Sequence, residues 1–302
     1  MRPSGRPEPL PGGLSGARLW AFETPAGRLV VRAWPTGMTP EQLARIHAWL
    51  EEVRVLPFVA TPLRDLGGAT FRRLPDRCWE LMPWLPGTPG LIDRPDSHKL
   101  AAAGTGLAAF HSRLAAQVRD GPSPGMARRV EELTQLLLGG LDRLDQALQR
   151  RPPTLLAQQA RDWLFSSRTT AETLLGEAKL AAAQPVPLQP CLRDARPDHF
   201  LFLGHELTGL IDFGAMEVDC VALDFARLLG EIRGLDRDGR CVFLAAYQNV
   251  RALEPQALRM IDQVMKVSKF LVTARWLAWH YLENKPIANE DVVQERLRGR
   301  VE

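Results

Sequence analysis

Two stretches decide the fold: CLRDARPDHF at positions 191–200 and LIDFG at positions 210–214. Short β-like runs at 200–203 and 207–211 lie between the two acidic positions and are joined by a turn that contains Gly204, so we expect a hairpin. In a hairpin, the second strand ends beside the start of the first strand. The hairpin therefore predicts that Asp194, in the polar loop, lies close to Asp212, at the end of an apolar strand. Two carboxylates in this arrangement indicate a metal-dependent site.

The hairpin lies within a region of helical periodicity. Apolar residues recur every three or four positions at 100–115, 130–148, 155–180 and 228–283, which predicts helices in these ranges. Pro152 and Pro153 end the second helix, and Pro255 interrupts the last one. The chain beyond about Gly87 is therefore expected to be mainly helical.

The first part of the chain has the pattern of a small sheet with one helix. β-type runs at 17–22, 28–34, 55–60, 69–74 and 78–84 predict five strands, and residues 24–27 predict a hairpin turn. A helix is expected after Thr39, a good N-cap residue that precedes Pro40. Its apolar face comprises Leu43, Ile46, His47, Leu50 and Val53. The fold class predicted is thus α+β, with a sheet-plus-helix lobe at 1–87 and a helical lobe at 88–302.

Composition excludes several classes of function. The formal net charge is only +3 and the chain is 45% hydrophobic, so neither nucleic acid nor a membrane surface is an expected partner. The four cysteines form no Cys-x-x-Cys pair, which indicates neither a zinc site nor a disulfide framework. No stretch reaches the length of a membrane span or has the apolar core of an export signal, so we expect a cytoplasmic protein.

The quoted motifs carry a family resemblance. The chain resembles the aminoglycoside phosphotransferase and choline kinase-like small-molecule kinases, whose catalytic loop reads His-Gly-Asp-x-His-x-x-Asn. On this sequence the family's Asp falls on Asp194 and its Asn on His199, while Leu192 and Arg196 occupy its two His positions. Residues 209–214 and 224–226 also match family motifs. The resemblance implies a bilobal protein-kinase-like fold.

The resemblance also implies the site residues. Asp194 would be the catalytic base, Asp212 the principal metal ligand and His199 the second ligand, with Asp198 as a possible helper. Residues that would bind the nucleotide are Gly12, Gly13, Ser15 and Gly16 in the phosphate-covering loop, Arg32 in place of the family's lysine, and Glu80 and Met82 near the adenine. Glu41, Glu51 and Glu52 are all candidates for the helical glutamate that orients Arg32. ATP and Mg²⁺ are the implied cofactors, and the imidazole of His199 also suits Mn²⁺.

The function that the resemblance implies is transfer of the terminal phosphoryl group of ATP to a hydroxyl of a small molecule. A protein kinase fits less well, because only nine residues separate Gly214 from Asp224 and leave no room for a peptide-docking activation segment. The alternative is a catalytically silent pseudokinase that binds a nucleotide or a protein partner as a scaffold, since Arg32 and His199 replace Lys and Asn. Aminoglycoside, choline-like, sugar and lipid acceptors all fit the pattern, and His47 is expected to be a packing residue.

Overall fold

The computed structural model describes residues 6–11, 16–286, 293–294 and 297. The chain divides into two compact units. The first comprises Met1–Val118, Gln189–Val218 and Glu231–Ala252, and the second comprises Arg119–Leu188, Asp219–Gly230 and Leu253–Glu302. The lobe boundary near residue 87 stays a prediction.

The first unit contains a five-stranded sheet, in which four of the strands are the predicted ones. Its strands are all antiparallel and lie in the order β1-β2-β3-β5-β4. Their bounds are β1 (Glu8–Leu10), β2 (Arg18–Thr24), β3 (Gly27–Ala33), β4 (Phe71–Leu74) and β5 (Arg77–Pro83). The β2–β3 turn forms as predicted, since the Thr24 hydroxyl donates to the Gly27 carbonyl at 2.7 Å and Gly27 takes a φ of +114°.

Helix α1 (Pro40–Glu52) packs on this sheet. The Thr39 hydroxyl accepts a hydrogen bond from the Gln42 amide at 3.1 Å, as expected for an N-cap, and Pro40 opens the helix. Leu43 packs with Trp34 of the β3 end and with Cys78 of β5. The predicted helix is therefore confirmed, and its buried face looks onto the strands that carry Arg32 and Glu80.

Two strand assignments differ from the prediction. Residues 55–60 form turns, and only Val59 makes a single bridge, to Leu210. Their apolar character predicted a strand, but the backbone makes local turn hydrogen bonds from Leu56 and Val59 and meets the end of one strand, at Leu210, through Phe58 and Ala60. The missed strand is β1, which lies in a proline-rich stretch and forms by pairing with β2.

The rest of the first unit positions the hairpin. Strands β9 (Phe200–Leu203) and β10 (Glu206–Leu210) form the predicted hairpin, and β6 (Thr88–Pro89) pairs with β9. Helices α2 (Ser97–Arg113) and α7 (Arg237–Gln248) pack so closely that a side chain at Gly104 would collide with the Phe243 carbonyl. Short 3₁₀ turns η1 (Ala115–Gln117) and η3 (Pro197–His199) complete this unit.

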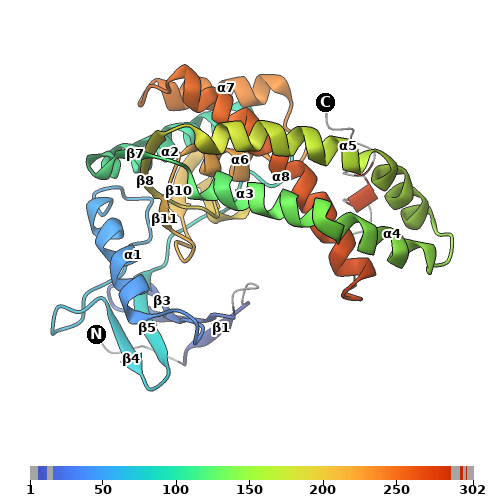
Figure 1. Ribbon diagram of the computed structural model, residues 1–302. Helices are drawn as coiled ribbons and strands as arrows, with labels where there is room; N and C mark the ends of the chain where they lie inside the picture. Colours follow the sequence, from blue (N-terminus) through green and yellow to red (C-terminus); the bar gives the residue numbers. More distant parts are fainter. Residues whose placement is uncertain (1–5, 12–15, 287–292, 295–296, 298–302) are drawn as a thin grey trace. The chain divides into compact units, whose positions relative to one another are not determined.

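The second unit is mainly helical (Figure 1). It contains α3 (Pro124–Gln135), the π-turn η2 (Leu136–Gly140), α4 (Leu141–Gln149), α5 (Leu155–Ala183), α6 (Ala222–Leu229) and α8 (Pro255–Tyr281). Strand β7 (Arg119–Gly121) pairs with the start of β8 (Val186–Cys191), and β11 (Glu217–Asp219) precedes α6. Helix α5 lies along α3 and α8, and a core formed by Leu144, Leu148, Ala157, Ala160, Leu277 and Tyr281 joins α4, α5 and α8.

The helix predicted at 130–148 is interrupted within the second unit. Leu138 leaves helical geometry and Gly139 takes a φ of +124°, so α3 and α4 are separate helices joined by η2. The apolar stripe continues through the break, which is why periodicity alone did not reveal it. None of the helices in the described part of the chain has both the length and the apolar character needed to cross a bilayer.

Gly139→Ala is expected to destabilise the protein by about 1–2 kcal/mol, because an L side chain is strained at this φ although nothing lies within 4 Å of its Cβ position. Gly176→Ala is the matched control: its Cβ position is equally open, but Gly176 lies inside α5, where alanine should stabilise by about 0.5–1 kcal/mol. Urea unfolding of both variants measures the difference. Equal effects would contradict the assigned kink.

Candidate active site

The loop between β8 and β9 is held by an internal ion pair. Arg193 takes a φ of +65°, which turns the chain, and Arg196 then donates to both carboxylate oxygens of Asp198 at 2.9 and 3.0 Å. These hydrogen bonds raise the pKa of Arg196. Burial favours the neutral form of Asp198, but the hydrogen bonds and charge of Arg196 outweigh it and lower the pKa of that carboxyl. Asp198 thus has Arg196 as its partner.

His199 links this loop to the Asp212 carboxylate. His199 is 9% exposed as a residue, and its Nδ1 lies 3.0 Å from the backbone carbonyl of Asp194. A carbonyl only accepts hydrogen bonds, so Nδ1 carries the proton in this arrangement. The other nitrogen, Nε2, lies 3.8 Å from Asp212 Oδ2. The loop residue Asp194 and the turn residue Asp212 therefore both border the same imidazole.

The turn after β10 presents Asp212 and buries the residue that follows. Asp212 takes a φ of +64°, and its side chain is 44% exposed. Phe213 is buried and stacks on Phe110 with ring centroids 6.1 Å apart. A Cβ on Gly214 would lie 2.7 Å from the Trp34 ring, so this close approach requires glycine. Packing of Phe213 and Gly214 thus fixes the position of the backbone that carries the Asp212 side chain.

Arg32 on β3 meets that carboxylate. The Arg32 side chain is buried, with Nη1 at 3.5 Å from Asp212 Oδ1 and Nε at 3.6 Å from Glu80 Oε1. Its guanidinium also lies over the Trp34 ring, 4.6 Å from the centroid. The predicted residues Arg32, His199 and Asp212 therefore gather at one place.

Glu80 and His47 extend the cluster to α1. Glu80 lies opposite Arg32 in the β3–β5 register, and its Oε2 is 2.7 Å from His47 Nε2. Nδ1 of His47 is 2.7 Å from the Thr70 hydroxyl. Both His47 and Glu80 are 5% exposed. His47 was expected only to pack, and periodicity placed it on the buried face without showing its polar partner.

The other predicted nucleotide-binding residues have mixed outcomes. Met82 is buried on β5, opposite Val30, and Gly16 takes a φ of +75°. Gly12, Gly13 and Ser15 lie outside the described residues. The helical glutamates Glu41, Glu51 and Glu52 are all exposed, and the carboxylates paired with Arg32 in the described part of the chain are those of Glu80 and Asp212. Nucleotide binding by these residues stays a prediction.

The residues present fit a divalent cation. Asp212 supplies a partly exposed carboxylate, and His199 supplies a nitrogen whose ring is oriented by a backbone carbonyl on its other side, as is common for ligating histidines. One oxygen donor and one nitrogen donor suit Mn²⁺ as well as Mg²⁺.

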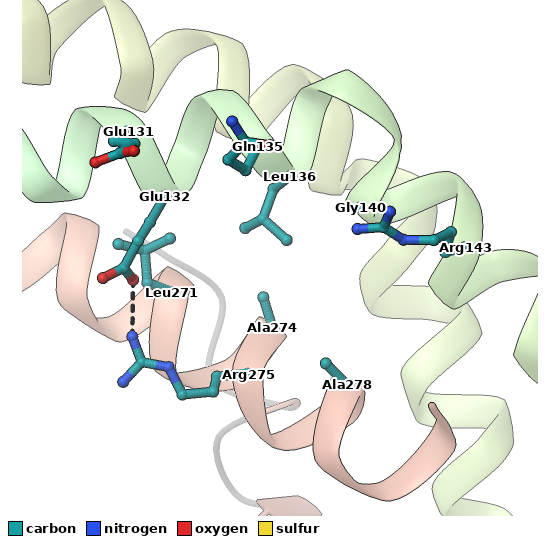
Figure 2. A pocket seen from close by; sticks show the side chains of 10 residues that line it. All are labelled: Glu131, Glu132, Gln135, Leu136, Gly140, Arg143, Leu271, Ala274, Arg275 and Ala278. Atoms are coloured by element: carbon teal, nitrogen blue, oxygen red, sulfur yellow. Dashed lines mark hydrogen bonds and ion pairs between the residues drawn. The ribbon is translucent and has the colours of Figure 1, made fainter. Parts of the chain in front are cut away.

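The second unit contains a separate pocket of about 390 Å³. Figure 2 shows Leu136 of η2 and Ala274 and Ala278 of α8 pointing into the space between α3 and α8. The lining residues are Glu131, Glu132, Gln135, Leu136, Gly140, Arg143, Leu271, Ala274, Arg275 and Ala278. Glu132 pairs with Arg275 at 2.7 Å, and the apolar part of the lining comes from Leu136, Leu271, Ala274 and Ala278.

The family model described as the phosphotransferase enzyme family matches residues 7–261. The chain belongs to this family. No curated protein matches the chain at a significant level.

Solved structures of other phosphotransferases share the fold of this family member. An aminoglycoside phosphotransferase from Alicyclobacillus acidocaldarius is 16% identical with a TM-score of 0.67, and the match covers 96% of this chain and 86% of that one. Spectinomycin phosphotransferase in complex with ADP and spectinomycin is 13% identical with a TM-score of 0.64, covering 97% and 88%. An ethanolamine kinase from Plasmodium vivax is 11% identical with a TM-score of 0.56, covering 97% and 80%. The predicted α+β kinase-like fold is confirmed.

The ion pair in the loop makes the stability of this protein depend on pH. Because folding lowers the pKa of Asp198, its carboxylate stabilises the protein above the unfolded-state pKa of about 3.9, and this contribution is lost as pH falls through the folded-state pKa. We expect Asp198→Asn to lower the melting temperature at pH 7 and the difference from wild type to shrink below about pH 4. Thermal unfolding monitored by circular dichroism measures this.

Asp76→Asn, in the exposed turn between β4 and β5, controls for the loss of one negative charge and should change the melting temperature little. A difference between Asp198→Asn and wild type that stays constant with pH would contradict the role of the ion pair.

Proposed function

We propose that this protein transfers the terminal phosphoryl group of ATP to a hydroxyl of a small molecule. Its membership of the phosphotransferase enzyme family supports the reaction class. The single observation that carries the proposal is the shared Asp212 carboxylate, which has the Arg32 guanidinium at 3.5 Å on one side and the His199 imidazole at 3.8 Å on the other. A buried cation, a carboxylate and a nitrogen donor at one place suit a metal-bound triphosphate.

Each residue has a separate role in this proposal. Arg32 binds phosphate oxygens, and its planar group can contact two of them at once. Asp212 and His199 hold the cation, which neutralises charge on the phosphates when bound. Asp194 orients the acceptor hydroxyl and takes its proton. Gly12, Gly13, Ser15 and Gly16 are proposed to contribute to phosphate binding, and the β5 backbone near Glu80 and Met82 to adenine binding.

Related proteins support the choice of nucleotide. The spectinomycin phosphotransferase structure contains ADP and spectinomycin, and a second aminoglycoside phosphotransferase of the same fold is ADP-bound. We therefore propose ATP as donor and a small alcohol as acceptor. Aminoglycosides, sugars, choline-like alcohols and lipid alcohols form the acceptor panel to be tested.

The second candidate is a nucleotide-binding scaffold without turnover. Two residues favour it: Arg32 and His199 stand where the family resemblance has Lys and Asn. The two candidates differ in what happens to bound ATP, since only the enzyme transfers phosphate.

Asp194→Asn should separate the two candidates. If Asp194 takes the proton of the acceptor, the variant should lose about 10²- to 10⁴-fold in kcat while ATP binds with nearly unchanged affinity. Transfer of labelled phosphate to the acceptor panel and calorimetric titration with ATP measure the two quantities. Asp76→Asn is the matched control and should keep wild-type turnover.

Turnover that survives in Asp194→Asn would contradict the assigned base. Wild-type protein that binds ATP but transfers phosphate to no hydroxyl in the panel, with either Mg²⁺ or Mn²⁺, would support the scaffold instead.

The metal preference gives a further prediction. An imidazole nitrogen favours Mn²⁺ over Mg²⁺ relative to an amide oxygen, so His199→Asn should lower the ratio of Mn²⁺ to Mg²⁺ affinity about tenfold. Electron paramagnetic resonance of free Mn²⁺, with ADP present and Mg²⁺ as competitor, measures this ratio without turnover. His205→Asn, in the β9–β10 turn, is the control. An unchanged ratio in His199→Asn would show that His199 is not a ligand.

A further inference from the structure

The first unit contains a continuous polar chain that runs from Arg32 through Glu80 and His47 to Thr70. We propose that Glu80 is a positioning residue for Arg32 and that His47 holds Glu80 in place, so that α1 supports Arg32 through a histidine and a sheet carboxylate. This inference rests on the proposed function, in which Arg32 binds nucleotide phosphates. It assigns to the Glu80 side chain and to His47 a role in that same site.

Strand register brings Glu80 to Arg32. The two residues are directly opposite in the antiparallel β3–β5 pair, an arrangement that puts their side chains on the same face of the sheet. Glu80 Oε1 lies 3.6 Å from Arg32 Nε. Because the Glu80 side chain is almost fully buried, its charge must be compensated by protein groups rather than by water.

His47 supplies the second compensating contact. The ionised Glu80 carboxylate only accepts hydrogen bonds, so His47 Nε2 donates across the 2.7 Å contact. Thr70 contacts the opposite ring nitrogen, and the Phe71 ring meets the imidazole edge-on at 5.6 Å. The imidazole is therefore fixed on several sides and fixes one oxygen of Glu80 in turn.

The glutamates of α1 do not take this role. Glu51 pairs with Arg54 and Arg64 at the exposed end of the helix, and Glu41 and Glu52 are exposed. The buried face of α1 presents His47 to the sheet instead. The carboxylate that accompanies Arg32 thus comes from β5, and the helix contributes the group that orients it.

The arrangement matters because Arg32 has two carboxylates near it. Asp212 Oδ1 lies 3.5 Å from Nη1, almost the same distance as Glu80 lies from Nε. Asp212 is also the proposed metal ligand. Without the charge of Glu80, Arg32 keeps Asp212 as its carboxylate partner and is drawn toward it, out of the orientation that Glu80 and Asp212 set together. Glu80 therefore opposes the electrostatic attraction between Arg32 and Asp212.

A purely structural ion pair would behave differently. Its loss would lower stability but would leave the preference for phosphate-bearing ligands unchanged. The informative quantity is the ratio of ATP affinity to adenosine affinity, because only ATP carries the groups that Arg32 is proposed to bind. Calorimetric titration of the full chain with each ligand, in the presence of Mg²⁺, measures this ratio.

Glu80→Gln, which keeps the shape and removes the charge, should lower the ratio about tenfold. His47→Leu should lower it in the same direction, whereas His47→Gln, which keeps an N–H donor, should retain most of it. Tyr247→Phe is the matched control: it removes a buried hydrogen bond to His111 in the same unit and should leave the ratio unchanged. Melting temperatures show that each variant is folded, and the two His47 variants decide the matter if Glu80→Gln does not fold.

Arg32→Ala distinguishes the phosphate-binding role of Arg32 from the positioning role of Glu80 and His47. If Arg32→Ala leaves the ratio unchanged, the phosphate role of Arg32 in the proposed function is wrong. If Arg32→Ala lowers the ratio but Glu80→Gln and His47→Leu do not, the positioning role is overturned while the proposed function stands. In the double variant Arg32→Ala/Glu80→Gln, we expect no further loss beyond Arg32→Ala alone, because Glu80 acts through Arg32.

Discussion

The burial of the Arg32 guanidinium is the constraint on which the site depends. The Arg32 side chain is only 10% exposed and has lost most of its hydration, and burial of a charge is tolerated only when other groups compensate it. Compensation here comes from two carboxylates of different origin. Glu80 is supplied by strand register, and Asp212 is supplied by the turn that follows the β9–β10 hairpin. The site therefore requires that the five-stranded sheet and the hairpin are both formed.

An arginine suits this position for a geometric reason. Its nitrogens point in different directions, so Nε can face Glu80 while Nη1 faces Asp212, and the flat group can lie on the Trp34 ring. A lysine has one compact ammonium group and could not make these contacts in the same way. Trp34 is itself packed against Gly214, so the cation, the ring and the turn that carries Asp212 form one packed assembly.

The sequence predicted the features that local chemistry determines. Thr39 and Pro40 start α1, the turn at 24–27 forms its hairpin, and the apolar runs around Gly204 form β9 and β10, because capping and turn preferences act between near neighbours. Asp212, His199 and Arg32 were found because they lie in recognisable motifs. Their position at one place depends on the kinase-like fold, which was predicted from the family resemblance rather than from local sequence patterns.

What the sequence did not predict depends on contacts between distant segments. The side-chain role of Glu80 needs the β3–β5 register, and the role of His47 needs the rotation of α1 on the sheet. Residues 55–60 have strand-like composition but form local turns and a single isolated bridge to Leu210, so propensity predicted a strand that tertiary structure does not form. Gly139 lies within an unbroken apolar stripe, and the kink is revealed by the backbone angles of Leu138 and Gly139 rather than by the sequence pattern.

The departures from the family pattern compensate one another. Without Glu80, the buried Arg32 would lose one of its two carboxylate partners, and removing one partner of a buried ion pair costs about 3–5 kcal/mol. Glu80 removes that cost on the sheet side, but its own buried carboxylate then needs a second donor, and His47 provides it from the helix. Glu80 thus compensates the buried charge of Arg32, and His47 compensates the buried carboxylate of Glu80. These linked ion pairs and hydrogen bonds argue that Arg32 belongs to one connected polar cluster rather than being an isolated loss of the family's lysine.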